Sequence, residues 1–322
     1  MMKRSILSAL ISLTLFSSCK ESDSQFGQKL VNVFKTKSIN KRKIDWDMFE
    51  REVLKSAIIS KDSAIITSLT LNNNPHTFFL KGKKILKGNY ALNIPIDTCH
   101  LFGNLNKNLL ENIGYVRVDG FNTNTSESYR KDTLSSNYIN DIVNSIRKQD
   151  RDNLRGWIID LRYNSGGDMW PMLVATTPFL LPSILGSFKE ENRNLTWRLD
   201  NNEIWLGDNS QNIRLGVGKI KYKIINKNAK IAVLINHRTK SAGEAIVLAL
   251  KSLNNVKLFG LQTHGFATSN ETIYFGNKEV LVLTTGFMAD LKGQTYPNGI
   301  SPDVSTCSMK MLNYELNKWL LE

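Results

Sequence analysis

The chain has few of the residues that usually build metal and disulfide sites. Its 322 residues include only three cysteines and four histidines. Three cysteines are too few to establish a disulfide framework, and no histidine or cysteine lies in the spacing of a zinc site. The sequence therefore predicts no metal site, and nothing in it indicates a cofactor.

Basic motifs interleaved with aromatic residues are also missing, although the formal net charge is +13. The lysines are spread over residues 29–55, 81–87 and 217–230. This pattern is typical of a solvated basic surface and does not indicate nucleic-acid binding. Attraction to anionic lipid head groups or acidic glycans is the alternative that the charge leaves open.

The N-terminus has the pattern of a targeting segment. Lys3 and Arg4 precede an apolar stretch, Ile6–Phe16, that is too short to span a bilayer as a mature helix. The letters Leu-Phe-Ser-Ser before Cys19 resemble the lipobox of bacterial lipoproteins. We predict a signal peptide over residues 1–18 and lipidation of Cys19 as a membrane anchor. An ordinary cleaved signal peptide with a chance cysteine is the alternative.

Both alternatives place the mature protein outside the cytoplasm. We predict a bacterial cell-envelope lipoprotein that either faces the periplasm or is exposed on the outer membrane. In an oxidising compartment Cys99 and Cys307 could pair, but two cysteines alone do not decide the point.

The apolar pattern divides the chain into a helical part and an α/β part. Residues 25–75 read as helical, and from residue 113 strand-like runs alternate with helical runs. This alternation favours an α/β core. The predicted segments are a tether over 19–37, a helical subdomain with short strands over 38–112, an α/β core over 113–310 with a β-rich insertion over 184–226, and a C-terminal helix over 311–322.

Two strand-to-helix junctions in the core carry the chemistry. Ser241 follows one buried strand and opens a helix, where free N–H groups can stabilise an oxyanion. A plain helix cap, with Glu244 completing a capping box, is the alternative. The other junction offers Gly166 and Gly167, whose missing Cβ atoms let backbone N–H groups face a ligand. Together the junctions could supply a nucleophile and oxyanion donors for acyl transfer.

Five stretches resemble, in order, the tail-specific or C-terminal processing serine peptidases, a superfamily that includes the tricorn core and the interphotoreceptor retinoid-binding protein modules. The stretches are IGYVRV at 113–118, GWIIDLRYNSGG at 156–167, AVLIN with TKSAGE between 232 and 244, GLQTHG at 260–265 and GISPD at 299–303. The resemblance implies a crotonase-like (ClpP-like) spiral of βα units, preceded by an N-terminal helical subdomain.

The resemblance also implies roles for the two junctions. Ser241 matches the nucleophile, and the N–H groups of Ala242 and of Gly166 or Gly167 match the oxyanion hole. Which glycine donates is left open. Many relatives use a lysine as the base, but this sequence has Phe266 at that position. Phenylalanine cannot accept a proton, so the usual Ser–Lys dyad is absent.

The tricorn-like branch takes its base from a histidine in an N-terminal turn, which His76 in the turn 74–77 matches. A neutral imidazole suits a general base at physiological pH. His264 lies on the loop that would carry the family's lysine and is the alternative base. The segment where that branch keeps an orienting glutamate has no carboxylate, so Asn298 or Gln294 would orient the imidazole.

Two further expectations concern the core. Asp160 and Arg162 are predicted to form a structural pair at the end of a central strand. Many relatives carry a peptide-binding PDZ module before the core, but the span 77–112 is too short to hold one.

These features predict an extracytoplasmic, lipid-anchored serine peptidase that cleaves peptides or proteins with a serine nucleophile and a histidine base. The alternative is a catalytically silent member of the same fold that binds a peptide or an apolar ligand in the old cleft. Neither prediction fixes the substrate or the oligomeric state.

Overall fold

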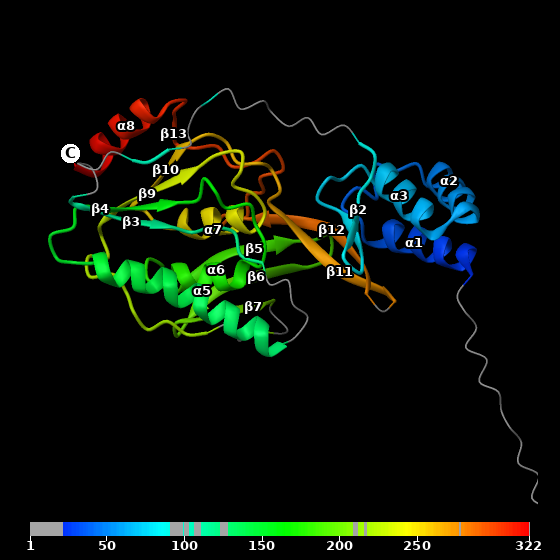
Figure 1. Cartoon of the computed structure of the whole chain (residues 1–322), viewed down its shortest axis with the longest axis horizontal. Helices are drawn as coiled ribbons and strands as arrows, with labels where there is room; N and C mark the ends of the chain where they lie inside the picture. The colour runs from blue at the N-terminus through cyan, green and yellow to red at the C-terminus, as the bar shows by residue number, and fades with distance from the viewer. Residues whose placement is uncertain are drawn as a thin grey trace, which may run out of the picture.

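The protein is described by a computed structural model, shown in Figure 1. The described residues are 22–90, 99, 103–105, 111–122, 128–208, 212–215, 218–276 and 278–321. The predicted signal peptide, residues 1–18, and the predicted anchor, Cys19, lie outside them. Within the described residues, no helix combines the length and apolar content that crossing a membrane requires.

Five parallel strands form the sheet on which the candidate site is built, in the spatial order β13-β10-β9-β4-β3. The bounds are β3 Ile113–Arg117, β4 Gly156–Asp160, β9 Lys230–Ile235, β10 Val256–Gly260 and β13 Val304–Ser305. All residues of β4 and nearly all of β9 are buried. Parallel strands that are covered on both faces need such continuous apolar runs. The four strands predicted between residues 113 and 260 are therefore present.

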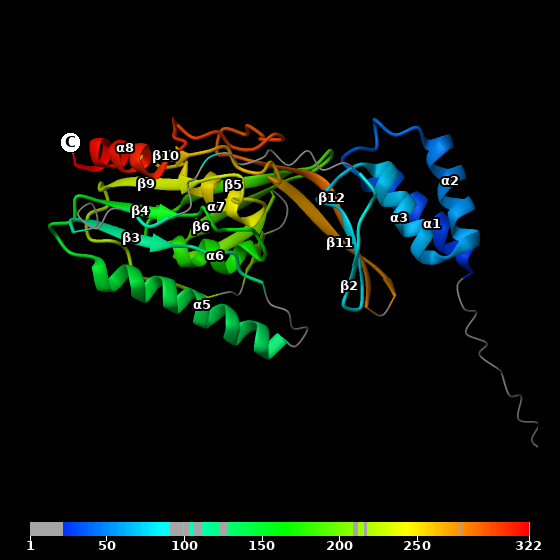
Figure 2. The ribbon, with the colours of Figure 1, turned by 45° about the horizontal axis from the view of Figure 1, so that its top comes forward.

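Helices cover both faces of this sheet (Figure 2). Their bounds are α5 Ser128–Gln149, α6 Met169–Thr176, α7 Ala242–Leu250 and α8 Met309–Leu321. Side chains of α5, α6 and α7 pack together with Trp157 and Ile159 of β4. The intervening residue, Ile158, packs with Leu316 of α8 on the opposite face. Burial of each such side chain stabilises the fold by about 1.5–3 kcal/mol.

A second, antiparallel sheet lies beside the first, in the order β2-β1-β12-β5-β6-β7-β8, with β11 also paired to β12. The bounds are β1 Phe78–Lys81, β2 Lys84–Leu86, β5 Ser183–Lys189, β6 Asn194–Asp200, β7 Glu203–Gly207, β8 Asn212–Arg214, β11 Thr268–Gly276 and β12 Glu279–Ala289. The segment predicted as a β-rich insertion thus supplies β5 to β8. Of these strands, β5 pairs with β12, where Ser187 lies opposite Ala289.

Three N-terminal helices pack on this second sheet. Their bounds are α1 Asp23–Lys37, α2 Trp46–Ile59 and α3 Lys61–Asn72. Phe26 of α1 meets Phe79 and Phe275 edge-on, with ring centroids 6.5 and 5.4 Å apart. The predicted tether is therefore wrong over residues 23–37. Apolar residues recur there at helical spacing and are fully buried, so the segment is part of the fold.

A disulfide joins Cys99 to Cys307, 208 positions later in the chain. It ties the segment that follows the N-terminal helices to the segment just before α8. The structure therefore resolves the pairing that the sequence left open. Such bonds persist in oxidising compartments.

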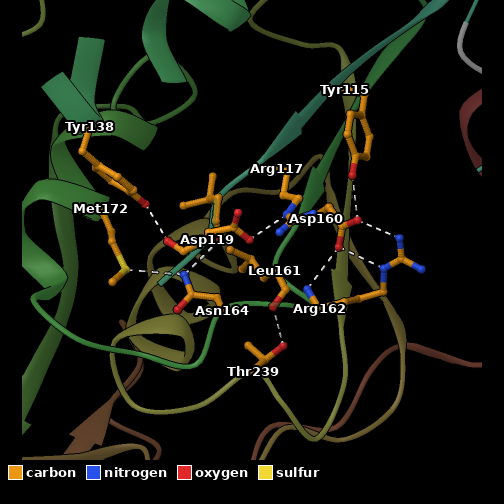
Figure 3. A network of polar contacts seen from close by, with 11 residues as sticks. Tyr115, Arg117, Asp119, Tyr138, Asp160, Leu161, Arg162, Asn164, Met172 and Thr239 are labelled. Carbon is orange, nitrogen blue, oxygen red and sulfur yellow. Dashed lines mark hydrogen bonds and ion pairs between the residues drawn. The ribbon is translucent and has the colours of Figure 1, made fainter. Parts of the chain in front are cut away.

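A buried ion pair fixes the end of β4 (Figure 3). The Asp160 carboxylate accepts hydrogen bonds from Arg162 Nε and Nη2 at 2.9 and 2.7 Å, and from the Tyr115 hydroxyl at 2.9 Å. Neither charged side chain is more than 2% exposed. Two residues on, Asn164 donates to the Val118 carbonyl at 3.1 Å. The predicted structural role of the pair is confirmed, and it holds the loop that follows β4.

Replacing Arg162 tests this role. Arg162→Met would leave the Asp160 carboxylate buried without its cation, so we expect the free energy of unfolding in urea to fall by about 3–5 kcal/mol. The matched control is Arg117→Met, which removes an ion pair to Asp119 that is about half exposed and should cost at most about 1 kcal/mol. Equal losses in the two variants would contradict the prediction.

Candidate active site

Ser241 occupies a strained turn between β9 and α7. Its backbone angles are φ 54° and ψ −116°. A residue with a Cβ rarely adopts positive φ, and such strain clusters at functional sites because the surrounding structure must hold it in place. Here the Ser241 N–H donates to the Glu244 carboxylate at 2.8 Å, which is one bond of the predicted capping box.

The loop before Ser241 lies against the loop that follows β4. The Lys240 N–H donates to the carbonyl of Asn164 at 3.1 Å. Gly166 consequently lies close to Ser241: a Cβ added to Gly166 would be 3.0 Å from the Ser241 Cβ. The structure therefore brings the two predicted junctions together.

The two glycines differ in what their N–H groups bind. The Gly166 N–H donates to Asn164 Oδ1 at 3.0 Å and is already used. The N–H groups of Gly167 and Ala242 have no hydrogen-bond acceptor among the described residues. Gly167 has a φ of 128°, and a Cβ there would be 2.1 Å from the Phe121 carbonyl oxygen, so only glycine fits. Gly167 and Ala242 are therefore the candidate oxyanion donors.

Ser241, Ala242 and Gly167 share the wall of a cavity of about 470 Å³, a volume typical of ligand-binding sites. The rest of the wall comes from the loop after β4, from α6 and from the antiparallel sheet. Those residues are Asp168, Met169, Trp170, Phe188, Glu190, Arg193, Leu195, Leu206, Thr268, Ser269, Asn270, Glu271, Thr272 and Met288. The wall thus combines apolar and polar side chains in similar measure.

His76 lies behind this wall, in the turn before β1. Its Nδ1 is 2.6 Å from the hydroxyl of Thr268, and the amide nitrogen of Asn270 is 3.4 Å from Nε2. Thr268 and Asn270 are wall residues, whereas His76 itself is not. Burial lowers the pKa of His76 to about 4, and the nearby His264 and Lys240 contribute to the shift. His76 is therefore a neutral imidazole at physiological pH.

Phe266, at the position of the family's lysine, separates the two candidate histidines. The His76 ring stacks on it, with centroids 4.6 Å apart and planes 11° from parallel. His264 meets the same ring edge-on at 4.3 Å. Its Nδ1 lies 3.2 Å from the His237 carbonyl oxygen, and burial lowers its pKa. His264 is thus bound to the loop between β9 and α7, which also carries Ser241.

The structure does not bring Gln294 or Asn298 to His76. Neither side chain has a hydrogen bond to His76 within the described residues; the Gln294 backbone N–H donates to Asp290 Oδ1, and the Asn298 backbone carbonyl accepts from Gln262. The residues in contact with the imidazole nitrogens are Thr268 and Asn270 instead, which sequence reasoning missed. Both residues lie at the start of β11, where the letters Thr-Ser-Asn give only a weak strand signal.

Glu244 is fully buried and joins the serine turn to the loop that carries Phe266. In addition to the Ser241 N–H, its carboxylate accepts from the Thr263 hydroxyl at 2.6 Å and the Gly265 N–H at 2.9 Å. Burial raises the pKa of Glu244 to about 7, while these hydrogen bonds act to lower it. One carboxylate therefore positions both sides of the site.

A protein-family model described as Peptidase family S41 matches residues 112–306. The nisin-resistance protein of Lactococcus lactis subsp. lactis is 34% identical over 181 residues, which cover 56% of this chain and 54% of that protein. The carboxy-terminal-processing protease of Bartonella bacilliformis is 28% identical over 193 residues, covering 60% and 38% respectively. The chain thus spans about half the length, or less, of these curated relatives.

Solved structures show the same architecture. A lipoprotein from Streptococcus agalactiae matches with a TM-score of 0.68 over 99% of each chain, at 20% identity. The photosystem II D1 C-terminal processing protease matches with a TM-score of 0.54 over 91% of this chain and 97% of that chain, at 15% identity. The predicted crotonase-like α/β fold with an N-terminal helical subdomain is confirmed.

The raised pKa of Glu244 has a consequence for stability. Between its ordinary value of 4.5 and about 7, the folded protein keeps a proton that the unfolded chain releases. The wild type should therefore lose stability as the pH rises through this window, relative to Glu244→Gln, which does not titrate. We expect the difference in free energy of unfolding to change by up to about 3 kcal/mol between pH 5 and pH 8.

Urea unfolding of both proteins at the two pH values measures this difference. Glu52→Gln, which replaces a carboxylate that is 38% exposed on α2, is the control and should follow the wild type. The prediction would be contradicted if the free energy of unfolding of the wild type rose relative to that of Glu244→Gln between pH 5 and pH 8.

Proposed function

The chain belongs to peptidase family S41, and we propose on that premise that it is a serine peptidase acting on peptides or proteins. The observation that carries the proposal is the constellation around Ser241. A serine at positive φ shares a cavity wall with two backbone N–H groups that have no other acceptor among the described residues. Acyl transfer needs such a nucleophile beside a preformed oxyanion site.

In the proposed reaction, Ser241 Oγ attacks the carbonyl carbon of the scissile bond while His76 takes the hydroxyl proton. The carbonyl oxygen becomes an oxyanion that the N–H groups of Ala242 and Gly167 bind. His76 then returns the proton to the leaving amine, which departs and leaves an acyl ester on Ser241. A water molecule, deprotonated by His76, hydrolyses that ester and restores the serine.

Two observations support His76 over His264 as the base. His76 bonds to Thr268, which lines the cavity with Ser241, and its ring also contacts Asn270 of the same wall, whereas His264 bonds to His237, which does not line the cavity. When Nδ1–H donates to Thr268, Nε2 carries the lone pair, and it accepts the serine proton once the hydroxyl takes the place of the Asn270 amide, 3.4 Å away. Substrate binding must still draw Ser241 and the imidazole together, as catalytic hydrogen bonds often tighten only in the complex.

A silent binding protein is the second candidate, and one observation favours it. The groups that contact the His76 nitrogens, Thr268 and Asn270, are neutral. A neutral partner stabilises an imidazolium less than a carboxylate does, so His76 would be a weak base or none. The same cavity would then hold a peptide or an apolar ligand without cleaving it.

We also propose that the protein is held outside the cytoplasm by a lipid on Cys19. The disulfide between Cys99 and Cys307 supports an oxidising compartment. The full-length structural likeness to a streptococcal lipoprotein supports the anchor. The similarity to a nisin-resistance protein makes nisin one substrate to test.

Labelling with a fluorophosphonate probe tests the nucleophile and the base. The wild type should be labelled, Ser241→Ala should not, and Ser252→Ala, just past the end of α7, should match the wild type. His76→Gln should slow labelling by about 10²–10⁴-fold, and His264→Gln by less than about tenfold. Labelling of Ser241→Ala would exclude this nucleophile, and an unlabelled wild type would favour the binding protein.

The pH dependence of labelling tests the environment of His76. A base works only when it is deprotonated, and burial lowers the pKa of His76 to about 4. The rate should therefore rise with pH to a half-maximal value near pH 4, instead of near the 6.5 of an exposed histidine. Glu244→Gln is the control and should keep this midpoint. A midpoint that moves in Glu244→Gln would assign the titration to Glu244 instead.

A further inference from the structure

Four large apolar side chains are exposed near the ends of the N-terminal helices and hairpins. Ile58 and Ile59, at the end of α2, are 84% and 76% exposed. Ile85 of β2 is 56% exposed and Tyr274 of β11 is 72% exposed. We call these four residues the apolar tip. None of them contributes to the cavity beside Ser241, so the proposed reaction does not explain their exposure.

The start of α1 and the end of α2 lie side by side, because the two helices run antiparallel. A Cβ added to Gly27 of α1 would be 3.0 Å from the Cβ of Ala57. The Lys61 ammonium, just past the end of α2, lies 4.8 Å from the ring centroid of Phe26. The chain therefore enters the fold next to Ile58 and Ile59.

Polar contacts bring both hairpin turns to the same end. Asp62, at the start of α3, accepts from Lys81 at 2.6 Å and from Lys84 at 3.2 Å, which holds the β1–β2 turn. Within that turn the Gly82 N–H donates to the Lys278 carbonyl of the β11–β12 turn at 2.8 Å. Figure 1 shows the two hairpin ends and the start of α1 on one side of the molecule, and the turned view of Figure 2 agrees.

Positive charge surrounds the apolar tip. The lysines in these turns or within one helical turn of the isoleucines are Lys55, Lys61, Lys81, Lys83, Lys84 and Lys278. The carboxylates in the same segments are Asp23, Asp62 and Glu279. Six lysines against three carboxylates leave an excess of three positive charges. Exposed apolar groups ringed by lysine are suited to the interface of an anionic bilayer.

The length of the entering chain places this end near a membrane. This step rests on the lipid anchor proposed above for Cys19. Only two residues lie between Cys19 and Ser22, and the three chain steps from Cys19 to Ser22 span at most about 11 Å even when fully extended. Since α1 begins at Asp23, an acyl chain on Cys19 would hold the apolar tip against the bilayer surface.

We propose that the apolar tip is a second membrane contact, which docks on an anionic lipid surface. Ile58 and Ile59 enter the head-group region, and the surrounding lysines pair with lipid phosphates. A lipid on Cys19 holds the protein at the bilayer but leaves it free to tumble, whereas a second contact fixes its orientation. Docking through the tip sets the direction in which the cavity beside Ser241 faces relative to the membrane.

Vesicle co-sedimentation tests the proposal without the anchor. The protein is the chain from residue 19 with Cys19→Ala, so that no acyl chain contributes. The vesicles are phosphatidylcholine alone or mixed with phosphatidylglycerol. We expect binding to the mixed vesicles, much weaker binding to phosphatidylcholine, and at least about tenfold weaker binding of Ile58→Ser/Ile59→Ser. The matched control is Met311→Ser/Tyr314→Ser on α8, where both side chains are also exposed, and it should bind as the parent protein does.

The proposal would be overturned if the tip variant bound as well as the control variant, or if the parent protein did not bind the mixed vesicles. A parent protein that is dimeric in solution and becomes monomeric in the tip variant would also overturn it, because the tip would then be a contact between copies. Fluorophosphonate labelling separates this outcome from the proposed function. The tip variant should be labelled at the parent rate, so each proposal can fail while the other stands.

Discussion

The parallel pairing of β4 with β9 is the constraint on which the site depends. Parallel strands end at the same edge of a sheet, and here Asp160, the last residue of β4, lies opposite Leu234 of β9. The loops that follow both strands must therefore leave the sheet side by side. One loop carries Gly167 and the other carries Ser241, so backbone geometry alone places the candidate oxyanion donors beside the candidate nucleophile. The buried pair of Asp160 and Arg162 keeps the first loop from moving away.

Glu244 extends this arrangement to a third loop. It lies one turn into α7, yet its carboxylate binds the backbone of both the serine turn and the segment around Gly265. That segment positions Phe266, on which His76 stacks. His76 is thus positioned by its packing on Phe266 and by the second sheet. Ser241 and Gly167 are positioned by loops that follow strands of the first sheet. The two halves of the proposed dyad come from separate parts of the fold.

This division explains which features the sequence could predict. Ser241, Gly166 and Gly167 lie in local strand-turn-helix patterns, and such patterns can be read along the chain. The partners of His76 could not be read in this way, because Thr268 is 192 positions distant and meets it only through the pairing of β1, β12 and β11. Gln294 and Asn298 looked suitable by position, but the Gln294 backbone is bonded to Asp290 and the Asn298 backbone to Gln262. The tether was wrong for a different reason: the helical spacing of apolar residues within 23–37 was visible in the sequence, but their partners Phe79 and Phe275 lie far along the chain.

The bond between Cys99 and Cys307 also changes how the chain is connected. The disulfide closes residues 99–307 into a covalent ring. This ring contains both strand-to-helix junctions, the central strands of both sheets and the loop that Glu244 binds. A single cut of the backbone anywhere in that ring opens it without separating two pieces, because the sulfur atoms still join them. The part of the chain that carries the candidate site therefore remains one covalent molecule after a nick, which is an advantage for a protein in a compartment that contains other peptidases.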